Sequence, residues 1–194
     1  MPNQRNTLDE IEKWCWSQLL RATRHRRSDF RWMNLATVDN TGTPTTRTVV
    51  LREVDKPKRS VAFYTDARSE KISELKAKNA VGLHFQSDRH STQMRMTGTA
   101  SFATEERRLM AWEGLHPGAK ASYAQPISPG SPILPPAQRS SDTPVEIGQG
   151  YRNFTVVDVS ITRIDWLELH RDGHRRALFA RGPHGQLQST WLAP

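Results

Sequence analysis

Strand-like segments joined by short turns dominate residues 31–102, and this pattern limits the fold more than any other feature of the chain. RWMNLATV (31–38) is followed by the turn DNTG (39–42) and then by TPTTRTVVLREV (43–54). This is the pattern of a β-hairpin in which Gly42 takes a positive φ. Strands that are joined by tight turns pair antiparallel. We therefore predict a mainly antiparallel sheet.

Further strand-like segments continue this pattern to the end of the chain. They are residues 59–65, 80–86, 92–102, 151–169, 175–181 and 186–194. Eight or nine strands, with two or three helices between them and no alternating βαβ pattern, predict a mainly β protein, a β-barrel with peripheral helices. The length of 194 residues fits a single domain that spans residues 1–194.

The N-terminal segment, residues 7–22, is predicted to be an amphipathic helix. Thr7 and Glu10 have the spacing of a capping box, and the apolar residues that follow keep helical spacing. Cys15 lies among them and is expected to be a buried structural thiol. A single cysteine excludes an internal disulfide and is typical of a reducing compartment. We see no apolar signal region and no apolar run near the ~20 residues of a membrane helix, so we expect a cytoplasmic protein.

Two shorter helices and one long loop are predicted further along the chain. One helix starts near Arg68 or Ser69, and another occupies residues 104–116 with Thr104 as its N-cap. The apolar side of the later helix consists of Leu109, Met110 and Trp112. Residues 117–144 hold seven of the twelve prolines, so we predict a long Pro-rich loop there.

The chain is strongly basic, with 28 Lys and Arg against 20 Asp and Glu and a formal net charge of +8. This balance favours anionic partners such as nucleic acid or a phosphorylated small molecule. The densest cluster is RATRHRRSDFR (21–31), with five arginines and a histidine. It follows a predicted helix, where cations are favourable. The cluster is therefore either a solvated helix end or a contact for nucleic acid.

Several familiar catalytic motifs are absent from the sequence. There is no G-x-G-x-x-G, P-loop, H-E-x-x-H or G-x-S-x-G. His170 and His174 are four residues apart, but a turn that contains Gly173 lies between them, so no metal site is predicted. No residue is assigned a catalytic role.

Polar groups around one strand end and the next helix start are the best candidates for a binding site. Tyr64 and Thr65 end a predicted strand, and Ser69 and Lys71 lie where the next helix begins. Free backbone N–H groups and the helix dipole favour an anion at such a position. The alternative is ordinary helix capping.

Two further polar residues stand in strands. Arg47 either adds a bidentate grip on the same anion or is a structural arginine, exposed or paired with Glu53 or Asp55. Gln93 is expected to face inward together with Arg95 and Thr97. There its amide either hydrogen-bonds a ligand or pairs within the sheet.

Taken in order, these segments resemble the pyridoxamine 5′-phosphate oxidase-like family of FMN-binding split β-barrels. LATVDNTGTPTTRTVVLREVD is similar to the family's opening hairpin, and FYTDARSEK is similar to its strand end and helix start. AVGLHFQ and TQMRMTGTA are similar to the strand pair that follows. IDWLELHRDGHRRALF and the closing WLAP are similar to its last hairpin and C-terminus. The resemblance covers more than half of the chain.

The resemblance implies an FMN site and names its residues. They are Arg47, Ser69 and Lys71 at the phosphate; Tyr64 and Thr65 at the phosphate and ribityl chain; the backbone of Thr48, Val49, Val50 and Leu51 beneath the isoalloxazine ring; and Arg52, Gln93 and Arg176 at the ring or the substrate side. Members of this family are homodimers with FMN in clefts between the subunits. Part of each site would therefore come from the partner chain.

Two departures from the family pattern concern the substrate. The helix start carries Glu70 and Lys71 where true pyridoxamine 5′-phosphate oxidases carry Arg-Lys. HRRALF lacks the His-Asp pair of their last hairpin, although Arg175 or Arg176 stands in for one arginine. The resemblance therefore supports FMN binding better than vitamin B6 chemistry. We expect an FMN-dependent oxidoreductase with an unassigned substrate; the alternatives are a non-catalytic flavin sensor or carrier and a basic nucleic-acid-binding β-barrel.

Overall fold

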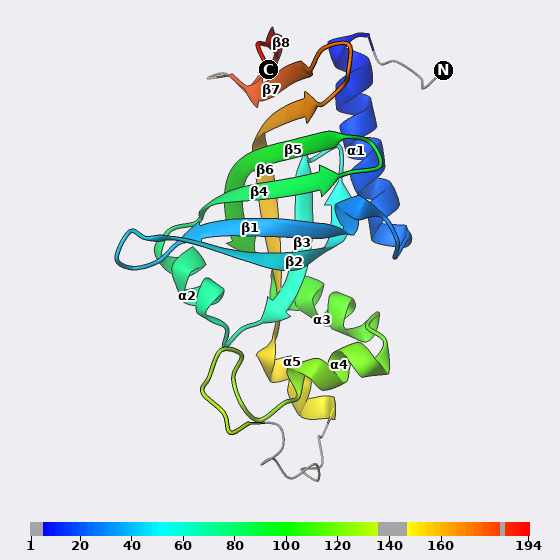
Figure 1. Ribbon diagram of the computed structural model, residues 1–194. Coiled ribbons are helices and arrows are strands. Elements are labelled where there is room, and N and C mark those ends of the chain that lie inside the picture. Colours follow the sequence, from blue (N-terminus) through cyan, green and yellow to red (C-terminus); the bar gives the residue numbers. More distant parts are fainter. Residues whose placement is uncertain (1–5, 136–146, 183–184) are drawn as a thin grey trace.

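The computed structural model describes residues 6–135, 147–182 and 185–194 (Figure 1). Its strands are β1 (Trp32–Val38), β2 (Pro44–Asp55), β3 (Ser60–Asp66), β4 (Ala80–Ser87), β5 (Thr92–Phe102), β6 (Phe154–Glu168), β7 (Arg175–Arg181) and β8 (Leu187–Leu192). Its helices are α1 (Leu8–Arg24), α2 (Glu70–Ala77), α3 (Glu105–Glu113), α4 (Pro117–Tyr123) and α5 (Gly150–Asn153), with short 3₁₀ segments η1 (Asp29–Arg31) and η3 (Ile147–Gln149).

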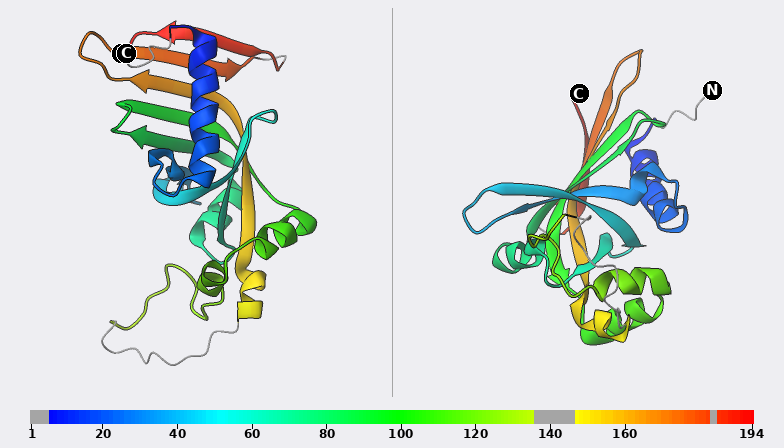
Figure 2. Two further views of the ribbon diagram at one scale, coloured as in Figure 1. Left: turned by 90° about the vertical axis from the view of Figure 1, so that its right-hand side faces the viewer. Right: turned by 60° about the horizontal axis from the view of Figure 1, so that its bottom comes forward.

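The eight described strands form one antiparallel sheet in the order β3-β2-β1-β4-β5-β6-β7-β8. β3 also pairs with β6, from Ser60 opposite Ser160 to Asp66 opposite Phe154. This extra pairing closes the first six strands of the order into a barrel. β7 and β8 extend the sheet beyond the closed part, and Figure 2 shows them at its edge. The predicted mainly β fold, an antiparallel barrel with peripheral helices, is confirmed.

β6 joins the barrel to its extension. Its first half pairs with β3 and its second half with β7, while β5 pairs along most of its length. The β5–β6 register shifts between Thr97 and Gly98. There a Cβ on Gly98 would lie 2.2 Å from the carbonyl oxygen of Ser160. This irregularity in the ladder therefore requires glycine.

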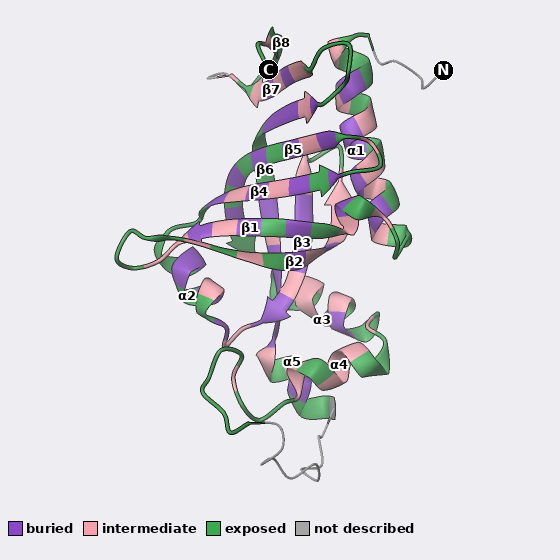
Figure 3. Cartoon of the chain, in the orientation of Figure 1, coloured by how far each residue is buried: buried purple, intermediate pink, exposed green. Residues whose placement is uncertain are grey.

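The barrel interior and the inner face of α1 share one apolar core. Figure 3 colours all buried residues purple, those of this core among them. Strand residues alternate between buried and exposed, as in β1 and β5. α1 contributes Ile11, Cys15, Trp16 and Leu19 to this core. The predicted capping box of α1 and the predicted burial of Cys15 are both confirmed.

The alternation in β5 corrects the expected direction of Gln93. Met94 and Met96 are buried, whereas Gln93 is half-buried and Arg95 and Thr97 are exposed. The methionines take the interior positions because burying their apolar surface is favourable. Gln93 therefore faces the outside of the barrel.

α3 is less buried than its sequence predicts. It begins after the N-cap Thr104 and it buries Trp112, but Leu109 and Met110 are exposed. The helix covers the barrel with one narrow side, centred on Trp112, so only part of its apolar surface finds a neighbour. None of the described helices has the length and apolar character needed to span a membrane.

The Pro-rich segment is not one continuous loop. α4 forms at its start because Pro117 occupies the first turn, where a missing N–H is tolerated, and His116 caps the helix by accepting from the Gly118 N–H at 3.1 Å. Residues 124–135 are irregular, as predicted, and the rest of that prediction lies outside the described residues. α5 also forms where a strand was predicted, so β6 begins only at Phe154.

Candidate functional site

Arg47 extends from β2 toward α2 and lies in a network of polar side chains. Its guanidinium donates through Nη1 to the hydroxyl of Thr37, and through Nη2 to Thr45 Oγ1 at 2.9 Å and to Glu74 Oε2 at 2.8 Å. Glu74 is only 2% exposed, whereas Arg47 is 21% exposed. The two threonine hydroxyls also donate to Glu74. The carboxylate is thus surrounded by donors.

The partner of Arg47 differs from the one that its strand suggests. Arg47 pairs with Glu74 of α2 rather than with Glu53 or Asp55. Glu53 instead pairs with Arg107 of α3 at 3.1 Å. The β2–β3 register shifts between Leu51 and Glu53, so the strand does not keep a regular alternation from Arg47 to Glu53.

Lys71, in the first turn of α2, holds the second group of polar side chains. Its Nζ donates to Thr65 Oγ1 at 3.1 Å and to Ser69 Oγ at 2.9 Å. The Ser69 hydroxyl in turn donates to the carbonyl oxygen of Asp66 at 2.6 Å. Thr65 and Ser69 are buried at the junction of β3 and α2. The structure thereby brings these predicted residues together.

Arg47 and Lys71 are neighbouring cations. Burial lowers the pKa of Lys71, and the positive charge of Arg47 lowers it further. A nearby anion would relieve this repulsion. Among the described contacts, three of the five N–H donors of Arg47 and two of the three of Lys71 are used. The remaining donors suit a phosphate group.

Residues 48–51 continue the site along β2. Val49 and Leu51 are buried in the core, and Thr48 and Val50 alternate with them on the outer face. The Thr48 hydroxyl donates to Asn34 Oδ1 of β1 at 2.9 Å. The register shift that follows Leu51 leaves the next residue in a β-bulge. A bulge re-aims the side chain that it carries.

Arg52 is the residue in this bulge. Its guanidinium carbon lies 5.6 Å from the centre of the Tyr64 ring, and its buried Nε has no hydrogen-bond partner in the part of the chain that the structure describes. The Tyr64 hydroxyl donates to Glu53 Oε1 at 2.7 Å. Burial and this hydrogen bond raise the pKa of Tyr64, which keeps it protonated. An unpaired buried N–H is costly and points to a missing acceptor.

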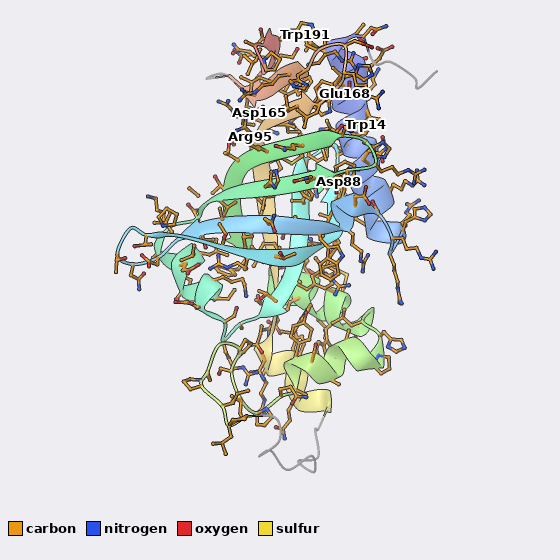
Figure 4. All side chains as sticks on the ribbon, in the orientation of Figure 1. Trp14, Asp88, Arg95, Asp165, Glu168 and Trp191 are labelled. Carbon is orange, nitrogen blue, oxygen red and sulfur yellow. The ribbon has the colours of Figure 1, made fainter. Side chains whose placement is uncertain are left out.

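Gln93 and Arg176 lie on the outer face of the sheet, the face that also carries Thr48, but away from Arg47. Arg176 of β7 donates to both carboxylate oxygens of Asp165, at 3.0 and 2.8 Å. Arg95 donates to the same carboxylate at 2.9 Å, and Figure 4 labels Arg95 and Asp165. No hydrogen bond or ion pair among the described residues joins Gln93 or Arg176 to Arg47. One chain therefore presents two separate parts of the predicted site.

Glu74, Thr37 and Thr45 belong to the cluster but were not predicted from the sequence. Glu74 is one of three buried residues of α2, with Ile72 and Leu75. An acidic residue within the apolar face of a short helix was the available signal. The two threonines are opposite each other in the β1–β2 register, a placement that only the hairpin alignment reveals.

The part of the chain that carries this cluster is similar to known proteins. The family model of the pyridoxamine 5′-phosphate oxidase FMN-binding domain matches residues 13–104, which include Arg47, Lys71 and Glu74. Pyridoxine/pyridoxamine 5′-phosphate oxidases of Edwardsiella ictaluri and Vibrio atlanticus are each 36% identical, over 95 and 97 residues. Residues 13–104, just under half of the chain, are thus similar to the FMN-binding domain of the pyridoxamine 5′-phosphate oxidase family. The predicted cofactor of the family, FMN, is thereby confirmed.

The chain aligns with only part of those enzymes. The aligned segments make up 49% and 50% of this chain and 41% and 44% of the Edwardsiella and Vibrio proteins. The match thus spans less than half the length of these curated relatives.

Solved structures resemble the protein over nearly the whole chain. A pyridoxamine 5′-phosphate oxidase-related, FMN-binding protein of Nostoc punctiforme has a TM-score of 0.76 at 24% identity, covering 94% of this chain and 96% of that one. PhzG of Burkholderia lata, solved in complex with tetrahydrophenazine-1-carboxylic acid, has a TM-score of 0.73 at 17% identity, covering 100% and 95%. At these identities the likeness confirms the split-barrel fold.

Proposed function

We propose that the chain is an FMN-dependent oxidoreductase in which Arg47 and Lys71 bind the phosphate of FMN. The observation that carries this proposal is the pair of neighbouring cations, each with unused N–H donors. A phosphate dianion fits them because it offsets both charges and accepts several hydrogen bonds. Free backbone N–H groups at the start of α2 add neutral donors. Thr65 and Ser69 hold Lys71 in place for this task.

The ring of FMN is proposed to follow β2 from this phosphate site. The backbone of residues 48–51 then lies beneath the isoalloxazine ring. Arg52 lies beside the ring or on the side where the substrate binds. The outward-facing Thr48 and Val50 support this course, because they leave a strand surface that a flat ring covers. The unpaired Nε of Arg52 supports a ligand acceptor beside it.

A second subunit is proposed to complete each site. Gln93 and Arg176 share the outer face with Thr48, but they stand on other strands, away from Arg47. We therefore assign them to the flavin held by the partner in a homodimer. Trp32, which is opposite Val50 and 57% exposed, supports the view that another surface covers this face. A cytoplasmic location stays a prediction.

When bound, FMN supplies two-electron redox chemistry by accepting hydride. The residues of the chain bind FMN and orient it and the substrate. Arg47 and Lys71 fix the phosphate, β2 supports the ring, and Arg52 is placed to orient an anionic substrate. None of the described residues is assigned as a general base.

The substrate is proposed to be a cyclic compound with an anionic group. The named relatives act on pyridoxine or pyridoxamine 5′-phosphate, and PhzG was solved with a phenazine carboxylic acid. In this chain burial lowers the pKa of Arg31, and the charge of Arg52 lowers it further, so two cations lie close to each other at this end of β2. Which ring system is bound is unassigned, because the His-Asp pair of the true oxidases is absent.

The absorption spectrum of the purified protein with and without added FMN tests the proposal. We expect a flavin spectrum that stays with the protein through gel filtration. Arg47→Ala combined with Lys71→Ala should weaken FMN binding by about 100-fold or more, because each removes a charge-assisted contact. Lys58→Ala, at an exposed lysine in the turn between β2 and β3, is the control and should bind FMN normally. A protein that does not bind FMN would refute the proposal.

The alternative is a flavoprotein without turnover, and the missing His-Asp pair favours it. The two functions separate in one experiment. The FMN-loaded protein is mixed with candidate cyclic phosphates and carboxylates, and flavin bleaching is followed before and after oxygen is admitted. Bleaching by a donor and rapid recovery in oxygen indicate an oxidoreductase. A flavin that stays oxidised with every donor indicates a carrier or sensor.

A further inference from the structure

Glu74 places a buried negative charge inside the site proposed for the FMN phosphate. Its side chain is 2% exposed, and its two oxygens accept from Arg47 at 2.8 Å, from Thr45 at 3.1 Å and from Thr37. Burial alone would raise the pKa of Glu74, but the hydrogen bond from Thr37 and the charge of Arg47 lower it. The carboxylate is therefore ionised at neutral pH.

This charge is unusual for a phosphate site. Arg47 and Lys71 contribute two positive charges, and the negative charge of Glu74 offsets one of them. A bound phosphate dianion would then leave the cluster with excess negative charge, whereas the same cluster without Glu74 would be neutral. Two like charges separated by several ångströms inside a protein repel appreciably, because solvent screens them poorly there. Glu74 thus opposes the ligand that its neighbours attract.

The same carboxylate also has a favourable role in the protein without cofactor. Arg47 is largely withdrawn from solvent, and an arginine without a counter-ion beside Lys71 would be costly. Glu74 provides that counter-ion and accepts a hydrogen bond from Arg47 directly. It also accepts from the Thr45 hydroxyl, which in turn accepts from Arg47. It stabilises the empty site and weakens the filled one.

We propose that Glu74 is the internal counter-ion that competes with the FMN phosphate for Arg47, and that it sets how strongly the site distinguishes FMN from riboflavin. This inference rests on the proposed FMN function. Riboflavin has the same ring and ribityl chain but no phosphate. The charge of Glu74 therefore acts on FMN binding and leaves riboflavin binding nearly unchanged.

The test compares the dissociation constants of FMN and riboflavin for the cofactor-free protein and for Glu74→Gln. Glutamine keeps the shape and still accepts from Arg47, but it removes the charge. We expect Glu74→Gln to increase the preference for FMN over riboflavin by about tenfold. Glu106→Gln, an exposed residue of α3, removes the same net charge and should change the preference by less than about twofold.

Thermal unfolding of the cofactor-free variants provides a second measurement. Without its counter-ion the empty site of Glu74→Gln should be less stable than wild type, and added inorganic phosphate should raise its unfolding midpoint more than that of wild type. This readout also applies if the variant folds only in phosphate buffer. A purely structural role for Glu74 would lower stability without enlarging the response to phosphate.

The outcomes separate the inference from the proposed function. If wild type binds FMN no more tightly than riboflavin, the phosphate assignment of Arg47 and Lys71 is wrong. If wild type prefers FMN but Glu74→Gln shows an equal or smaller preference, the assignment stands and the role of Glu74 is overturned. An equal response of both proteins to inorganic phosphate would overturn it as well.

Discussion

At the scale of single residues, Asp165 forms more ion pairs than any other described residue on the outer face of the sheet. Arg176 contacts both of its oxygens, Arg95 contacts one at 2.9 Å, and Arg163 lies at 3.7 Å, while the carboxylate itself is 6% exposed. Burial alone would raise the pKa of Asp165, but the hydrogen bond from Arg176 and the charge of Arg95 lower it. The ionised form is therefore the one that stabilises the fold.

We expect Asp165→Asn to destabilise the protein in a pH-dependent way. The lowered pKa means that the contribution of Asp165 is fully present above about pH 4, the usual value in an unfolded chain, and is lost as the pH falls toward the folded-state pKa. The variant should lose about 2 kcal/mol of unfolding free energy near pH 7 and much less near pH 2. Urea unfolding across this range measures the difference. Asp88→Asn, at an exposed aspartate, should show a small difference at every pH; a constant large loss for Asp165→Asn would contradict the argument.

Arg47 shows how far single residues were predictable. The resemblance of residues 35–55 to the family's opening hairpin identified Arg47 as a candidate. The helix start that follows β3 placed Lys71 and Ser69 beside it. Glu74 was missed because its pairing with Arg47 depends on α2 folding back onto the β1–β2 hairpin, a long-range contact that no local pattern encodes. The contacts of FMN with these residues stay a prediction.

At the scale of elements, the β5–β6 irregularity makes a sharp prediction at Gly98. A Cβ there would lie 2.2 Å from the Ser160 carbonyl oxygen, which belongs to the backbone and has little freedom to move. Gly98→Ala should therefore cost about 3 kcal/mol of unfolding free energy. Gly148→Ala is the control, because its Cβ would meet nothing within 4 Å and should change stability by less than about 1 kcal/mol. Similar losses for both variants would show that the close approach does not matter.

The elements themselves were predicted best where a turn and a period agree. The β1–β2 hairpin has Gly42 at φ 90°, and β5 and β7 have the predicted bounds, because short turns and two-residue alternation are local signals. α4 was missed because its segment was judged by its prolines, although Pro117 stands at the one helical position that tolerates it. α5 was missed because four residues are too few to establish a helical period. The outward direction of Gln93 was missed because alternation alone does not say which face is inside.

At the scale of the whole molecule, the two separate parts of the predicted site call for a test of the homodimer. Arg47→Ala and Arg176→Ala should each weaken FMN binding, because each removes one part of every site. When the two variants are co-expressed with different tags, each mixed dimer should regain one site with both arginines. Random pairing then restores about a quarter of the sites, a fraction measured by flavin absorbance. No recovery in isolated mixed dimers would place both arginines in the same subunit's site.

The pairing of β3 with β6 has a consequence for how the chain reaches its fold. It joins Ser60 to Ser160, about a hundred residues apart, whereas the other barrel strands pair with closer neighbours along the chain. A contact between residues this far apart in the sequence has a high entropic cost of loop closure. During synthesis from the N-terminus, β3 therefore keeps an unpaired edge until most of the chain has left the ribosome. The strand that closes the barrel, β6, also carries Asp165 and pairs with β7. The barrel therefore closes only when part of its outer surface is already being built.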